Sequence, residues 1–149
     1  MKIRLGKTAD NHRRFNRLAG AALALALALG AAAPALAAQA WPAYSPQQSQ
    51  ALQTQGKTVL VDVYAPWCPT CRAQEPVLEK LLKEPEFAGI ATLRVDWDGQ
   101  REQARALGAP RQSTLLLYRG GKRVGLSVAE TNESRLRAFL RGQLGRAAD

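Results

Sequence analysis

Residues 58–72 read TVLVDVYAPWCPTCR, an apolar, β-branched run followed by two cysteines that enclose Pro69 and Thr70. The run from Thr58 to Ala65 is almost continuously apolar, which predicts a strand buried on both of its faces. Beyond the cysteines, apolar residues recur at helical spacing as far as Leu82. We therefore expect the cysteine pair at the junction between a buried strand and a helix.

The spacing of Cys68 and Cys71 suits thiol exchange better than it suits a structural staple. A disulfide that closes so short a loop stabilises a fold by only about 2 kcal/mol on the chain-entropy estimate. At a helix N-terminus, unpaired N–H groups and the helix dipole favour a thiolate on the first cysteine. The second cysteine lies one turn away, where it can attack a mixed disulfide. A passive structural disulfide and half of a metal site are the alternative readings.

Strands and helices alternate outward from this stretch. In chain order we predict a helix over 46–55 capped by Ser45, the strand 58–65, a helix after the cysteines as far as Glu84 and kinked at Pro76, a strand over 91–97, a helix over 100–107, two antiparallel strands over 114–118 and 123–128, and a last helix capped by Thr131. This order predicts an α/β fold with a mixed central sheet, a C-terminal antiparallel hairpin and helices on both faces.

The N-terminal residues have the pattern of a secretory signal peptide. A basic run precedes the uncharged stretch Leu18–Ala40, which contains the small-x-small cleavage pattern Ala35-Leu36-Ala37. We expect residues 1–37 to be removed, which leaves one domain over 38–149. An uncleaved signal anchor and a twin-arginine signal are the alternatives. The expected location is outside the inner membrane, in the periplasm.

The charge of the chain argues against binding to nucleic acid. The chain has 21 basic and 12 acidic residues, but six of the basic and one of the acidic residues lie in 1–37, so the remainder has a net charge of only +4. Its basic residues are dispersed, without the clustering of a nucleic-acid footprint. His12, the one histidine, also lies in 1–37. The mature chain therefore lacks the residues for Ser-His-Asp or Cys-His catalysis and for a structural zinc site.

Residues 61–72 resemble the active-site region of the thioredoxin family. Further similarities lie at Pro76, Asp98, 114–118, Gly121 and 139–140, so that the resemblance covers most of 46–145. It implies the thioredoxin fold, attack by Cys68, resolution by Cys71, and a buried Asp62 that relays a proton to or from Cys71. The residues independently support the role of Asp62, because burial in an apolar strand raises the pKa of a carboxyl. The alternative for Asp62 is a carboxylate neutralised by a nearby Lys or Arg, such as Lys57.

The resemblance also implies a substrate groove, where one residue departs from the family. The residues expected to contact substrate are Trp67, Pro69, Thr70, Gln112 and Ser113. The family places a cis-proline where this chain has Ser113, and that proline shapes the groove and discourages metal capture. Because a cis bond before a residue other than proline costs about 3 kcal/mol, we expect the Gln112–Ser113 bond to be trans. Of the two thiols, we expect Cys68 to have the lower pKa and the greater exposure.

We interpret the chain as a thiol–disulfide oxidoreductase that uses no separate cofactor or metal and acts as a monomer. Its expected partners are protein disulfides and thiols, together with an electron donor such as a membrane thiol–disulfide carrier. Because neither Pro69 nor Thr70 offers the cationic stabilisation of a histidine, we expect a reductase-like direction. Two alternatives remain open: a non-catalytic module that binds a soft metal through the cysteine pair, and a partner domain whose disulfide never turns over.

Overall fold

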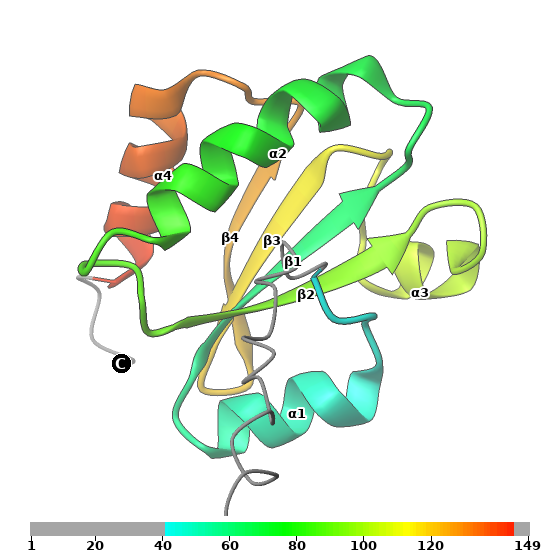
Figure 1. The fold of residues 1–149 in the computed structure, drawn as a ribbon. Coiled ribbons are helices and arrows are strands. Elements are labelled where there is room, and N and C mark those ends of the chain that lie inside the picture. The colour runs from blue at the N-terminus through cyan, green and yellow to red at the C-terminus, as the bar shows by residue number, and fades with distance from the viewer. Residues whose placement is uncertain (1–40, 145–149) are drawn as a thin grey trace, which may run out of the picture. The chain divides into compact units, whose positions relative to one another are not determined.

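The computed structural model describes residues 41–144, and Figure 1 shows their arrangement. The elements are α1 (Pro46–Thr54), β1 (Thr58–Tyr64), α2 (Pro69–Leu82), β2 (Ile90–Asp96), α3 (Arg101–Ala106), β3 (Thr114–Arg119), β4 (Lys122–Val128) and α4 (Glu133–Leu144). Every predicted element is present, and α2 continues through Pro76 as a single helix. The predicted signal peptide lies outside the described residues. Within the described part, no helix has the length and apolar character needed to cross a membrane.

The four strands form one mixed sheet in the order β2-β1-β3-β4. β1 runs parallel to β2 and antiparallel to β3, and β3 pairs with β4 as an antiparallel hairpin. β1 is therefore central and buried on both faces, as its continuous apolar run predicts. The predicted mixed sheet with a C-terminal hairpin is confirmed.

Helices cover both faces of this sheet, and each face has its own hydrophobic core (Figure 1). On one face, α2 and α4 bury their apolar sides against alternate residues of β1 and β3. On the other face, α1 and α3 pack over the remaining residues of β1, β2 and β3. Alternate side chains of a strand point to opposite faces, so the apolar run of β1 supplies both cores. This packing holds the C-terminal end of β1 and the start of α2 in place.

One local feature differs from the sequence-based expectations, and one was not predicted. The last helix is capped by Asn132 and not by Thr131: Asn132 Oδ1 accepts a hydrogen bond from the N–H of Arg135 at 3.1 Å. Glu130 explains the shift, because its carboxylate accepts the N–H groups of Thr131 and Asn132 and holds both residues outside the helix. In addition, residues 42–44 lie along the outer edge of β2, where Arg94 exchanges backbone hydrogen bonds with them at 2.7 and 2.8 Å.

Candidate active site

Cys68 is the N-cap residue of α2. Its backbone is extended, with φ −79° and ψ 115°, and its Sγ accepts a hydrogen bond from the N–H of Cys71 at 3.3 Å. Pro69 occupies the first helical position, where its missing N–H leaves no donor unsatisfied. The loop between β1 and α2 thus places one sulfur over the first turn of a helix, where an anion is stabilised. The predicted position of the pair at a strand-to-helix junction is confirmed.

The two thiols have opposite pKa shifts. Burial opposes ionisation of Cys68, but hydrogen bonds from the Cys71 thiol, from two N–H groups of the helix turn and from the Gln112 side chain outweigh it, so the pKa of Cys68 is lowered. Burial, reinforced by the hydrogen bond to Cys68 and by the negative charge of Asp62, raises the pKa of Cys71. The expected order of acidity agrees with this geometry.

The expectation that Cys68 is more exposed than Cys71 is wrong. Each cysteine is only 1% exposed. Cys68 is covered because it packs with Ala65 and Cys71 in a small cluster against the partly buried Tyr64 and Trp97. The difference between the two thiols in this structure is therefore one of pKa and not of accessibility.

Asp62 lies in β1, near enough to Cys71 for its charge to raise the pKa of that thiol, and is 2% exposed. Burial raises its pKa to about 6, although Arg94 acts in the opposite direction with Nε at 3.2 Å and Nη2 at 3.1 Å from Oδ2. The other carboxylate oxygen, Oδ1, has no hydrogen-bond partner among residues 41–144. A carboxyl with a pKa of about 6 takes up and releases a proton near neutrality, as the resemblance implies for this position. The neutralising cation is Arg94 and not Lys57.

Arg94 was not identified from the sequence, although it determines the electrostatics beneath the thiols. It lies directly opposite Asp62 in the parallel pair of β1 and β2. Its Nη1 donates to Glu75 Oε1 at 2.8 Å, and its guanidinium stacks on the ring of Tyr64 at 4.0 Å and faces that of Trp41 at 5.1 Å. The available signal was a single basic residue in β2, a strand predicted to follow one that carries a single acid.

The segment before β3 brings Ser113 to the site in an unusual backbone conformation. The Gln112–Ser113 bond is trans, as expected, and Ser113 has a φ of +59°. Its N–H donates to Val63 O at 2.7 Å, its carbonyl accepts the N–H of Ala129 at 2.8 Å, and its Oγ donates to Gln74 Oε1 at 3.2 Å. Ser113 is completely buried. It therefore holds the loop in place from beneath and presents no surface to a substrate.

The remaining residues expected to contact substrate lie around the sulfur of Cys68. The Gln112 side chain is near enough to Cys68 to contribute to the lowered pKa of that thiol. Trp67 is 53% exposed, and its Nε1 donates to Asp98 Oδ2 at 2.6 Å. Pro69 and Thr70 form the first turn of α2. Trp67, the residue before Cys68, thus leaves a large aromatic surface exposed next to that thiol.

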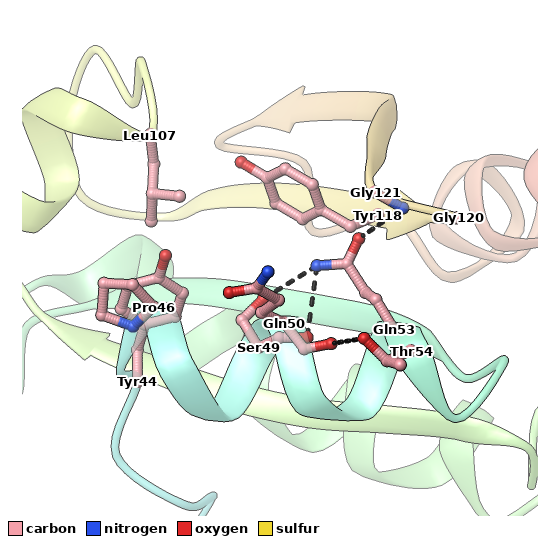
Figure 2. Close-up of a pocket in the computed structure, with 10 residues that line it drawn as sticks. All are labelled: Tyr44, Pro46, Ser49, Gln50, Gln53, Thr54, Leu107, Tyr118, Gly120 and Gly121. Atoms are coloured by element: carbon pink, nitrogen blue, oxygen red, sulfur yellow. Dashed lines mark hydrogen bonds between the residues drawn. The ribbon is translucent and has the colours of Figure 1, made fainter.

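A separate cleft of about 510 Å³ lies between α1 and the β3–β4 turn (Figure 2). Its lining includes Tyr44, Gln50, Gln53 and Tyr118, and it shares no residue with the cysteine site. Within residues 41–144, no group of three or more His, Cys, Asp or Glu side chains is arranged to hold a metal ion.

Comparison with known proteins agrees with this geometry. The thioredoxin family model matches residues 43–142. A thioredoxin of Chlamydia muridarum is 40% identical over 70 residues, covering 47% of this chain and 67% of the relative, and thioredoxin 1 of Nostoc is 31% identical over 86 residues, covering 58% and 79%. The crystal structure of Trxlp from Edwardsiella tarda superposes with a TM-score of 0.64 at 39% identity and covers 68% of this chain and 98% of that one.

Proposed function

Because the chain belongs to the thioredoxin family and has the thioredoxin fold, we propose that it is a protein thiol–disulfide oxidoreductase whose nucleophile is Cys68. One observation carries the proposal: the two thiols are in contact, and their surroundings lower the pKa of Cys68 and raise that of Cys71. A thiolate in contact with a protonated thiol is the arrangement that a two-step exchange requires. A disulfide with a purely structural role does not require two thiols of different pKa.

The proposed reaction transfers two electrons to a substrate disulfide. The Cys68 thiolate attacks one substrate sulfur, which forms a mixed disulfide and releases the other sulfur as a thiolate. Cys71 then loses its proton to the Asp62 carboxylate and attacks Cys68 Sγ, which forms the Cys68–Cys71 disulfide and releases the second substrate thiolate. The carboxyl is suited to this step because its pKa of about 6 lies near neutrality.

Substrate docking is proposed at the surface around Cys68. Trp67 offers an exposed aromatic face, Pro69 and Thr70 form the adjoining turn, and Gln112 contributes to the lowered pKa of Cys68. Large aromatic surfaces of this kind are typical of protein interfaces. We propose a monomer that acts on protein disulfides and is reduced again by a dithiol partner, such as a membrane carrier.

We also propose that the protein acts in the periplasm. The proposal is supported by the composition of residues 1–37, a basic run followed by an apolar stretch and a small-x-small pattern. The proposal predicts that N-terminal sequencing of the protein finds a mature chain that begins at Ala38. Retention of residues 1–37 would favour an anchored protein instead.

The proposed direction is that of a reductase, and equilibration with glutathione buffers tests it. Neither Pro69 nor Thr70 places a cation beside Cys68, so we expect a potential closer to the value of about −270 mV for thioredoxin than to about −120 mV for a strong oxidant. The matched variant Thr70→His adds a donor at the helix N-terminus and should raise the potential. A wild-type value above about −160 mV would assign a disulfide donor instead. Failure to form the Cys68–Cys71 disulfide at any glutathione ratio would contradict oxidoreductase activity.

A further inference from the structure

Arg94 is shared by two carboxylates, Asp62 of β1 and Glu75 of α2. Its Nε donates to Asp62 Oδ2 at 3.2 Å, and its Nη1 donates to Glu75 Oε1 at 2.8 Å. Even the most exposed of the three side chains, that of Glu75, is only 29% exposed, so water screens these interactions only in part. The cluster therefore has one positive charge for two acids.

The contact with Arg94 leaves one oxygen of Asp62 free. Both nearby nitrogens of Arg94, Nε and Nη2, approach Oδ2, whereas Oδ1 has no hydrogen-bond partner among residues 41–144. A carboxylate held by two parallel hydrogen bonds from a guanidinium would use both of its oxygens. Glu75 binds Nη1 and thereby helps to fix the guanidinium in the orientation that leaves Oδ1 free. A buried carboxylate oxygen without a donor is an atom that can take up a proton.

Glu75 has more hydrogen-bond donors around it than Asp62 has. Its Oε1 accepts from Arg94, and its Oε2 accepts from the hydroxyl of Tyr64 at 3.3 Å. Donors on both oxygens and partial contact with water favour a charged Glu75, whereas Asp62 is buried and has a donor on one oxygen only. When Asp62 holds a proton, the two remaining charges of the cluster, on Glu75 and Arg94, cancel.

Arg94 is also held by contacts that do not involve the Glu75 carboxylate. Its guanidinium stacks on the ring of Tyr64 at 4.0 Å and faces the ring of Trp41 at 5.1 Å. The register of β1 and β2 places it directly opposite Asp62. Removal of the Glu75 charge should therefore leave Arg94 beside Asp62, with its whole charge available to that carboxylate.

We propose that Glu75 is a positioning residue for the proton acceptor of the exchange: by binding Arg94 it keeps part of the guanidinium charge away from Asp62, so that Asp62 can accept a proton. The proposal rests on the proposed function for the role of Asp62 and adds to it the group that adjusts this role. The charged and titratable groups coupled to Asp62 are Arg94 from β2 and Glu75 and Cys71 from α2, and its neighbour in β3 is the uncharged Leu115.

The test is the titration of the Asp62 carboxyl in the reduced protein, followed by carbon-13 NMR of labelled aspartate carboxyls and assigned with the spectrum of Asp62→Asn. The wild-type midpoint, which gives the pKa of Asp62, should lie at about 6. In Glu75→Gln the midpoint should fall by about one pH unit, because the loss of a nearby negative charge and the release of Arg94 both favour the carboxylate. Glu75→Ala should shift the midpoint in the same direction and serves if the glutamine variant does not fold.

Glu133→Gln is the matched control. Glu133 of α4 also contacts an arginine that is shared with a second carboxylate, since its Oε1 lies 3.2 Å from Nη2 of Arg137, which pairs with Glu84 as well. This variant removes the same charge and the same kind of ion pair. The midpoint of Asp62 should stay at its wild-type value.

An unchanged midpoint in Glu75→Gln would overturn the proposal, and so would a raised one, which would show that Glu75 serves to hold Arg94 against Asp62. An equal fall in Glu133→Gln would also overturn it, because the effect would then follow from net charge alone. Disulfide exchange does not enter this measurement. A protein that shows the predicted shift but reduces no disulfide would contradict the proposed function and leave the effect of Glu75 on Asp62 standing.

Discussion

Asp62→Asn is expected to make the protein more stable at pH 7 and slower in disulfide exchange. The carboxyl is 2% exposed and its pKa rises from 3.8 to about 6 on folding, so the folded state binds a proton that the unfolded state has lost. The folded state is therefore favoured below pH 3.8, and this contribution is lost as the pH rises through about 6. At 1.36 kcal/mol per pH unit the loss amounts to about 3 kcal/mol at pH 7.

Chemical denaturation of Asp62→Asn and of the wild type across pH 4 to 8 measures this difference. The variant should gain little near pH 4 and up to about 3 kcal/mol above pH 6. Its exchange rate near neutrality should fall at least about tenfold, because the amide cannot accept the proton of Cys71. Equal exchange rates of Asp62→Asn and the wild type over the whole pH range would show that Asp62 has only a structural role. If the variant were less stable than the wild type at pH 7, the ion pair of Asp62 with Arg94 would outweigh the cost of burying the carboxylate.

Ser113→Pro is expected to lose about 3 kcal/mol or more of the free energy of unfolding. Ser113 has a φ of +59°, whereas proline is restricted to about −65°. Proline also removes the N–H that donates to the carbonyl of Val63 at 2.7 Å, which would leave a buried acceptor without its partner. The chain therefore cannot accept a proline here without rebuilding the loop, even though the family places a proline at this position.

Ser113→Gly is the matched control, because glycine also lacks the hydroxyl but keeps the N–H and adopts positive φ at no steric cost. Urea denaturation of both variants separates the backbone effect from the loss of the hydrogen bond to Gln74. Ser113→Gly should remain close to the wild type, within about 1 kcal/mol. If Ser113→Pro proved as stable as Ser113→Gly, the loop would not depend on the backbone geometry seen here.

Much of the fold could be predicted from the sequence because the relevant signals are local. The apolar run of β1, the helical spacing after the cysteines and the turn at Gly120-Gly121 each lie within one short segment, and each is present as expected. The burial and the raised pKa of Asp62 were also predictable, since it is the one acid in a strand whose apolar sequence predicts burial. The arginine that pairs with Asp62 was not predictable. Arg94 lies 32 residues further along the chain, and only the register of β1 and β2 brings the two together.

The arrangement around Ser113 could not be predicted, because it depends on contacts between distant segments. Gln74 lies on the buried face of α2 with Cys71, Leu78 and Leu81, so its spacing was visible, but an isolated buried glutamine does not reveal its partners. The positive φ of Ser113 is held from Val63, Gln74 and Ala129 and has no signature in its own sequence. The same holds for the burial of Cys68, which depends on packing against residues as distant in the chain as Trp97.

The most direct test of the central claim is a covalent trap with Cys71→Ser. Without the resolving thiol, the attack of Cys68 on a protein disulfide should stop at the mixed disulfide, and mass spectrometry should find the substrate attached to Cys68. Cys68→Ser is the control and should trap nothing, since desolvation and the charge of Asp62 raise the pKa of the remaining thiol. Attachment to Cys68 is the result that this account predicts. Attachment through Cys71 in the control, with none in Cys71→Ser, would contradict it.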